Sequence, residues 1–141
     1  NQEIVHQFNT SNSPLLSDKI YSIEINENTG EVFIGSDKGL VSYKGEATKG
    51  KDDYSDVYAY PNPVRPEYRD KVTITGLMDN SIVKITDLNG NLVYQTKSLG
   101  GQAIWNCRNT KGVRVASGVY LVLSATEDSK ESVVTKIAVI K

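Results

Sequence analysis

The feature that most constrains this chain is a recurring pattern of short runs rich in β-branched and aromatic residues. Turn residues separate the runs, and no stretch repeats its apolar residues with a helical period over three turns. Side chains alternate between the two faces of a strand, so such runs bury an apolar face only by pairing into sheets that pack against another layer. The sequence therefore predicts an all-β fold.

The first part of the chain predicts a small antiparallel meander. Strand-like runs cover residues 4–8, 20–25, 31–35 and 40–43. The connecting loops end in Gly30 and Gly39, and glycine supplies the positive φ that tight hairpins need. Such a meander is the unit of a propeller blade, which buries its two faces only against neighbouring blades. The polar, pattern-free stretch 45–56 that follows indicates a linker.

The second part predicts a sandwich of seven strands, of the immunoglobulin-like type. Asn89-Gly90, between two apolar runs, is the strongest hairpin signal in the chain. Trp105 is the largest apolar side chain and is expected to cover one end of the core. The expected strands are 57–60, 72–76, 81–87, 91–96, 102–106, 118–125 and 133–140. Alternation predicts a core of Ile74, Ile82, Val83, Ile85, Leu92, Val93, Ile104, Val119, Leu121, Val134, Ile137 and Val139.

Two stretches of the first part resemble a known repeat. Residues 12–23 followed by 30–40 are similar to the repeat of two-component-regulator-type propellers, with Phe33 where that repeat usually has Trp. The resemblance covers about a third of the chain. It implies that residues 1–44 are part of a propeller blade, and it says little about function.

The second part resembles two related families through the order of its motifs. These are the immunoglobulin-like domain of flagellar hook-capping proteins and the C-terminal domain of proteins handled by the type IX secretion system. Where the hook-capping pattern has Trp-Asp-Gly, this chain has Trp105-Asn106-Cys107, and its last strand fits the type IX pattern better. The motifs are Tyr60-Pro61-Asn62-Pro63, Asp87-Leu88-Asn89-Gly90, Trp105-Asn106, the run 112–120 and the terminal run 136–141.

The resemblance implies a non-catalytic C-terminal module that mediates secretion, sorting or surface attachment. The preceding blade favours a retained component of the secretion machinery over a signal cleaved from a cargo. The expected organisation is a partial blade over 1–44, a linker over 45–56 and a sandwich over 57–141. The expected location is extracytoplasmic, in the periplasm, at the outer-membrane surface or secreted. Expected partners are other envelope or secretion-system proteins and a surface polysaccharide.

Two motifs that suggest ligand chemistry have simpler structural explanations. Residues 45–51 match most of a phosphate-binding loop, but Asp52 stands where a Ser or Thr would hold magnesium, and no helix follows. Asp87, Asn89 and Asn91 alternate like calcium ligands, but the bidentate Glu is missing and Gly90 is misplaced. A hairpin turn explains these residues better.

The remaining polar residues form no catalytic or metal-binding constellation. His6 is the only histidine and Cys107 the only cysteine, so no disulfide within the chain is available. Asp52-Asp53 and Glu127-Asp128 lie in turn or linker sequence and are expected to be solvated. We therefore assign no catalytic, cofactor-binding or metal-binding residue and expect no enzymatic activity.

Bulk properties narrow the list of partners. Sixteen basic and 17 acidic side chains give a net charge of −1, which disfavours general nucleic-acid binding. The longest apolar runs are strand-sized, far below the roughly 18 residues that span a bilayer. The chain begins at Asn1 and shows no signal peptide, so we expect a piece of a longer protein. Four tyrosines around the domain entrance, Tyr54, Tyr58, Tyr60 and Tyr68, are expected to staple the linker to the sandwich, with sugar stacking as the alternative.

Two other interpretations stay open at this point. Propellers of this type also occur in extracytoplasmic sensors, whose chains continue into a membrane helix and a kinase. The sandwich could also be the tail of a secreted enzyme. In either case, a blade piece without neighbours exposes strand edges and apolar faces. We expect residues 4–8 to pair with the meander or with a second copy, which would give a homodimer.

Overall fold

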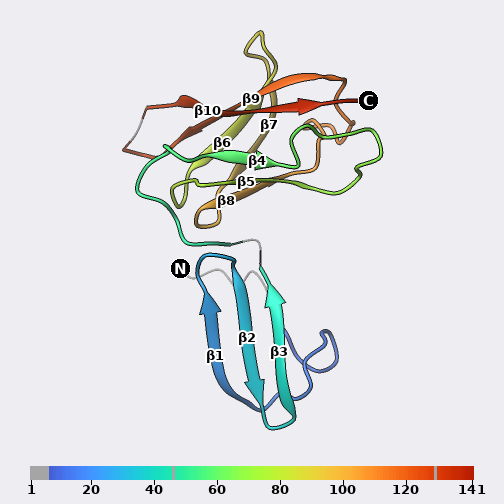
Figure 1. Ribbon diagram of the computed structural model, residues 1–141, viewed down its shortest axis with the longest axis vertical. Coiled ribbons are helices and arrows are strands. Elements are labelled where there is room, and N and C mark those ends of the chain that lie inside the picture. Colours follow the sequence, from blue (N-terminus) through green and yellow to red (C-terminus); the bar gives the residue numbers. More distant parts are fainter. Residues whose placement is uncertain (1–6, 46, 129) are drawn as a thin grey trace. The chain divides into compact units, whose positions relative to one another are not determined.

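The computed structural model describes residues 7–45, 47–128 and 130–141. It contains no helix among these residues, and its ten strands form three antiparallel sheets. The chain divides into two compact units, residues 1–45 and 46–141, each described here by itself (Figure 1). The prediction of an all-β fold is confirmed.

The first unit is a three-stranded antiparallel sheet in the order β1-β2-β3. Its strands are β1 (Ile20–Asn26), β2 (Glu31–Ser36) and β3 (Gly39–Lys44), joined by the two glycine-containing loops that the sequence indicates. The register places Ile23 opposite Ile34, and Ile34 opposite Val41, so one face is apolar across all three strands. Residues 4–6 of the expected strand 4–8 lie outside the described residues.

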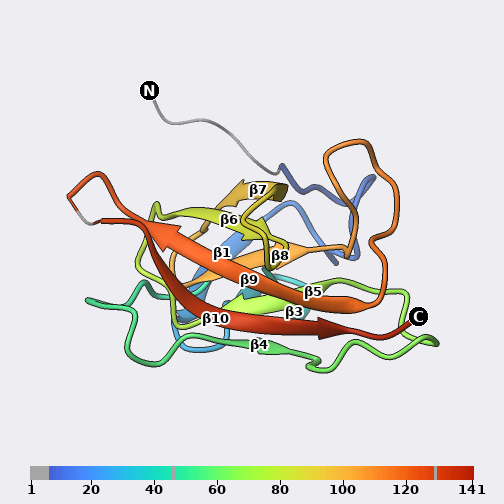
Figure 2. The same cartoon turned by 90° about the horizontal axis from the view of Figure 1, so that it is seen from above.

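The second unit is a sandwich of seven strands in two sheets (Figure 1). The larger sheet has the order β10-β9-β6-β7, and the smaller has the order β4-β5-β8. Edge strands β4 and β10 lie side by side on one flank of the sandwich (Figure 2). The strands are β4 (Tyr58–Tyr60), β5 (Val72–Thr75), β6 (Ile82–Thr86), β7 (Leu92–Lys97), β8 (Gln102–Trp105), β9 (Gly118–Ala125) and β10 (Ser132–Val139).

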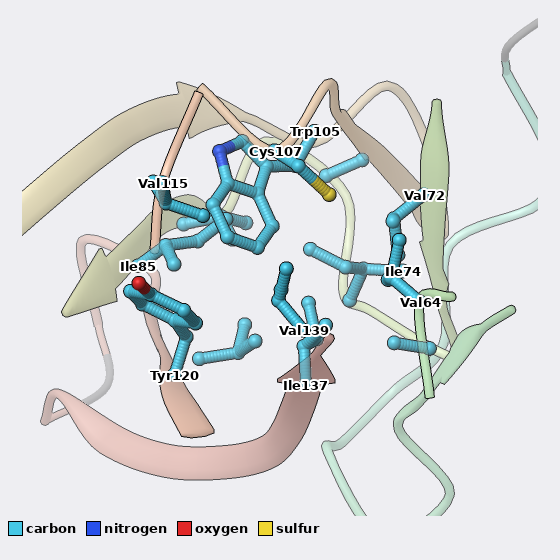
Figure 3. Packing of buried hydrophobic residues seen from close by; sticks show 14 of the residues in the cluster. Val64, Val72, Ile74, Ile85, Trp105, Cys107, Val115, Tyr120, Ile137 and Val139 are labelled. Carbon is cyan, nitrogen blue, oxygen red and sulfur yellow. The ribbon is translucent and has the colours of Figure 1, made fainter. Parts of the chain in front are cut away.

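The core of the sandwich is built around Trp105, which is fully buried (Figure 3). Its ring meets Tyr120 edge-on at 5.5 Å, a geometry that aromatic quadrupoles favour. The indole Nε1 donates to Arg108 O at 2.9 Å, and the Tyr120 hydroxyl donates to Ala116 O at 2.8 Å. Trp105 thus lies within the core instead of covering one end of it, and both aromatic polar groups are satisfied by main-chain carbonyls.

The predicted core is right along several strands and wrong at five positions. Ile74, Val83, Ile85, Ile137 and Val139 are buried as expected. Ile82, Leu92 and Val119, by contrast, are 44%, 52% and 39% exposed. Ile104 and Leu121 are half-buried and alternate with the inward residues of their strands, so they point away from the core. On β9 the buried residues are Tyr120, Val122 and Ser124, so the structure buries the opposite face to the one expected. The strand is apolar on both faces, and alternation alone does not say which face is inward.

Residues 47–56 of the expected linker 45–56 lie within the second unit. Lys51 N donates to Leu77 O at 2.8 Å, and Gly101 N donates to Thr48 O at 3.0 Å. The Tyr54 hydroxyl lies 2.8 Å from the buried Ser81 Oγ. This segment, expected to be a linker from its sequence, is hydrogen-bonded to the sandwich because the loops after β5 and β7 present main-chain groups to it.

Candidate functional site: the proline-rich entrance and the C-terminal strand

The segment that resembles a phosphate-binding loop uses its main chain for the fold. Thr48 N donates to Leu99 O at 3.4 Å, and Lys51 N donates to Leu77 O. A phosphate site needs several free amides pointing at one place. These two amides already donate to carbonyl groups of the sandwich and are not free to bind a phosphate. The segment is therefore part of the edge of the domain.

Asp87 is a turn residue in the structure. Its carboxylate accepts hydrogen bonds from Asn89 N and Asn91 N at 2.9 Å each, and from Asn91 Nδ2 at 2.8 Å. These bonds, led by the Asn91 side chain, lower the pKa of Asp87 below its ordinary value of 3.8. The residues that alternate like calcium ligands are thus engaged with one another across the β6–β7 hairpin.

The other candidate reactive residues stay apart. His6 lies outside the described residues. Cys107 is buried in the sandwich core, and this burial raises the pKa of its thiol. The positive charge of Arg114 lowers that pKa by a smaller amount, so the net shift is upward. Asp52-Asp53 and Glu127-Asp128 are exposed. Across the described ranges, no three His, Cys, Asp or Glu residues are grouped closely enough to hold a metal ion.

The Cys107 position explains a departure from the hook-capping pattern. Cys107 has a φ of 56°, in the left-handed region that favours glycine. The hook-capping pattern has glycine there, and this chain keeps the conformation with a non-glycine residue. In return, the side chain fills core space beside Trp105 (Figure 3).

The most specific arrangement of polar groups lies where the Pro-Asn-Pro segment meets the last strand. Strand β10 is an edge of its sheet, so every second main-chain group on its outer side has no strand to pair with. Asn62 takes the place of a neighbouring strand. Its Nδ2 donates to Lys136 O at 2.8 Å, and its Oδ1 accepts from Ala138 N at 3.0 Å.

Val64 continues the same pairing with its own main chain. Val64 N donates to Ala138 O, and Ile140 N donates to Val64 O, both at 2.8 Å. The Val64 side chain is fully buried in the core (Figure 3). We call this set of contacts, made by Asn62 and Val64 on residues 136–140, the β10 clasp. Beyond it, Lys141 N donates to Ser117 Oγ at 2.9 Å.

The sequence identified the Pro-Asn-Pro motif but not the role of its asparagine. Prolines on both sides of Asn62 remove two main-chain donors, and the chain is bent over residues 61–63, so the segment cannot pair as an ordinary strand. The side-chain amide of Asn62 then supplies the donor and acceptor that a peptide group would supply. Only the fold, which brings residue 62 beside residues 136 and 138, reveals this function.

The four tyrosines divide into two pairs. Tyr54 and Tyr68 are half-buried against the core, and the Tyr68 hydroxyl donates to Lys71 O at 2.8 Å. Tyr58 and Tyr60 are exposed on the outer face of the smaller sheet, with ring centroids 6.0 Å apart. The expectation that all four staple the entrance is therefore right for the first pair only.

Comparison with known proteins places this fold in a family. A family model described as a secretion system C-terminal sorting domain matches residues 58–141. Among solved structures, the chain is similar to PorZ of Porphyromonas gingivalis, described as an essential bacterial surface component of the type-IX secretion system. The two share 43% identity with a TM-score of 0.66 over 99% of this chain and 19% of PorZ.

A second structure, dimeric latent PorU from Porphyromonas gingivalis, is more distant. It shares 22% identity over 78% of this chain and 12% of PorU, with a TM-score of 0.45. No curated protein sequence matches the chain. Within the described residues there is also no helix of the length and hydrophobicity that crossing a membrane requires.

The family match spans the whole sandwich from β4 to the last residue, and the chain belongs to the family of secretion system C-terminal sorting domains.

Proposed function

We propose that this chain is the C-terminal region of a cell-surface component of a type IX secretion machinery, and that its sandwich is retained in the mature protein. The observation that most supports this is the similarity to PorZ, which runs through both units at 43% identity. A sandwich attached to an unrelated cargo would share only the sorting domain. The chain spans 19% of the PorZ chain, so the function of the whole protein is part of this proposal.

The β10 clasp gives the proposal a structural basis. Asn62 and Val64 fix residues 136–140 at the sheet edge, so the last strand of the matched sorting domain is held in one defined position. We expect secretion-system proteins to recognise the sandwich with this strand in place. We expect no catalysis by this region, since the polar groups described above are engaged in turns, edges and the core. We expect the outer-membrane surface as its location.

For the first unit, we propose that it is part of a propeller blade. Tyr21, Ile23 and Ile25 of β1 are 65%, 60% and 56% exposed on one apolar face. A neighbouring blade in the longer protein would cover such a face. In the isolated 141-residue chain, two copies would bury it against each other, so a homodimer through this face would be a property of the fragment.

A surface polysaccharide is a second proposed partner, and the exposed tyrosine pair supports it. Tyr58 and Tyr60 lie opposite Thr75 and Thr73 in the register of the smaller sheet, which sets two rings beside two hydroxyls. Aromatic faces and hydroxyls together suit sugar rings. The Tyr58→Ala/Tyr60→Ala variant should lose retention on immobilised surface polysaccharide from a type IX-secreting bacterium. Unchanged retention would exclude this face.

The extracytoplasmic sensor is not favoured, because both the matched family and PorZ are tied to secretion. A reporter fusion tests the main proposal against the remaining alternatives. Residues 46–141 are fused behind an exported reporter in a bacterium with type IX secretion, and in the same strain without its translocon. We expect surface exposure only in the first strain, with the domain still attached. Surface exposure with the domain removed would indicate a cargo signal, and a periplasmic reporter in both strains would contradict type IX sorting.

A further inference from the structure

The two flanks of the sandwich treat their strand edges differently. On one flank, the β10 clasp pairs residues 136–140 at the edge of the larger sheet. On the other flank, β7 ends the larger sheet and β8 ends the smaller one, and a bridge between Leu99 and Gln102 joins them at their hairpin. Folded proteins normally cover or blunt an edge strand, because its unpaired main-chain groups can pair with another chain.

The middle of β7 has main-chain groups that point away from the sheet. Successive residues of a strand turn their N–H and C=O groups alternately to one side and the other. Ser98 N donates to Ser81 O, on the side of β6, so Gln95 and Lys97 turn their groups to the outer side. Within the described part of the chain, these groups have no partner on that side. We call the N–H and C=O groups of Gln95 and Lys97 the β7 window.

The chain closes the edge of β7 on both sides of this window. At one end, Thr110 N donates to Val93 O at 3.0 Å. At the other end, Leu99 N donates to Gln102 O at 2.8 Å. The loops of the domain thus protect the ends of the edge and leave its middle open, which limits an added strand to a short segment.

A hollow beside the window gives an added strand room for its side chains. It has a volume of about 230 Å³ and lies between β7 and β8. The half-buried Tyr94 and Thr96 line it from β7, and Ile104 lines it from β8. Among the described residues around it, the charged ones are Lys71 and Lys97, both positive.

These charges select the kind of segment that fits. Two copies of the chain pairing through this edge would bring their lysines together, and lysine on an edge strand opposes such self-pairing. An acidic segment is attracted instead. In an antiparallel pair, a residue that exchanges both hydrogen bonds with Lys97 has its side chain on the same face as Lys97. A carboxylate at that position would therefore lie beside the exposed ammonium group.

We propose that the β7 window binds an extended acidic segment of a partner protein as an added antiparallel strand. Every second side chain of the segment is acidic and lies on the face of Lys97, and the residues between them face the hollow. This surface is separate from the β10 clasp and from the exposed tyrosine pair. It does not rest on the secretion role and holds or fails independently of it.

Fluorescence anisotropy of a labelled octapeptide of alternating glutamate and threonine tests the proposal on the full chain. We expect saturable binding with a Kd below about 1 mM. Lys97→Glu should weaken it about tenfold or more. Lys136→Glu makes the same change in net charge at the opposite edge of the same sheet and should leave it unchanged at physiological salt. No binding, or an equal loss in both variants, overturns the proposal.

N-methylated peptides separate main-chain pairing from attraction by charge alone. An N-methyl group removes a main-chain donor and keeps the side-chain charge. In the proposed pair the glutamates turn their main chain to β7, so N-methylation of every glutamate should abolish binding, whereas N-methylation of every threonine should leave most of it. In hydrogen exchange, the amides of Gln95 and Lys97 should gain protection when the unmodified peptide binds. If the two modified peptides bound equally, the site would respond to charge alone, as it would for a polyanion, and strand addition would be refuted.

Discussion

The β10 clasp predicts that a single exposed asparagine controls the stability of the C-terminal strand. Asn62→Ala removes the donor to Lys136 O and the acceptor for Ala138 N. A neutral hydrogen bond contributes about 0.5–1.5 kcal/mol net, and both lost bonds lie near solvent, where water replaces part of them. We therefore expect the free energy of unfolding of the sandwich to fall by about 1.5 kcal/mol, or about 6–12 °C in melting temperature.

Two assays follow this change at different scales. Trp105 is the only tryptophan and is buried in the sandwich, so its fluorescence in a urea titration reports the unfolding of this unit alone. Amide hydrogen exchange measures the edge locally. Ala138 N should lose protection in Asn62→Ala, while Ile140 N, which donates to Val64 O, should lose less.

Two further variants make the test specific. Asn62→Asp keeps the acceptor for Ala138 N and loses the donor, so it should preserve more protection at Ala138 than the alanine variant. Asn89→Ala removes an exposed asparagine side chain without a hydrogen bond and should change neither readout. If Asn62→Ala matched Asn89→Ala in both midpoint and exchange, the clasp would contribute nothing and our reasoning would be refuted.

Three other predictions concern the sandwich. Gly100→Ala should destabilise it by well over 2 kcal/mol in urea titrations, because a Cβ there would collide with Thr48 O. Gly112→Ala, also at positive φ but with open space around it, should cost only about 1 kcal/mol. Equal costs for the two variants would contradict this account. The pKa of Asp87 is lowered in the fold, so its stabilisation is present above the ordinary value of 3.8 and is lost as pH falls through the folded pKa. Unfolding midpoints between about pH 6 and pH 2 should therefore fall less for Asp87→Asn than for the parent, and parallel curves would refute this. Cys107 is buried with a raised pKa, so it should react with a thiol reagent only as fast as the sandwich opens, and reaction at the rate of a free thiol in the native state would contradict its placement.

The strand pattern was predictable because it depends on local chemistry. Seven runs of β-branched and aromatic residues marked the seven sandwich strands, and Asn89-Gly90 marked the hairpin between β6 and β7. Glycines at positive φ fixed the turns, since few other residues adopt that conformation at low cost. The order of motifs from Tyr60 to Lys141 was also sufficient to indicate the secretion-domain family.

The choice of buried face was not predictable, since β9 has apolar residues on both sides. The inward set of Tyr120 and Val122 is selected by their contacts with the opposite sheet, where Tyr120 meets Trp105. The outward set of Leu121 and Leu123 then forms an exposed hollow that no period in the sequence reveals. Alternation gives the spacing of inward residues and leaves their direction to tertiary packing.

The sequence by itself determined the strands, the turns and the family, because each depends on residues that are near one another or in a fixed order. The tertiary structure alone decided the roles of Asn62, Cys107 and Thr86. The partners of Asn62 are more than 70 residues away, Cys107 adopts its positive φ while filling the core, and Thr86 becomes an unpaired buried hydroxyl only under neighbouring leucines. These properties arise from contacts between distant segments, which come into existence only when the two sheets pack.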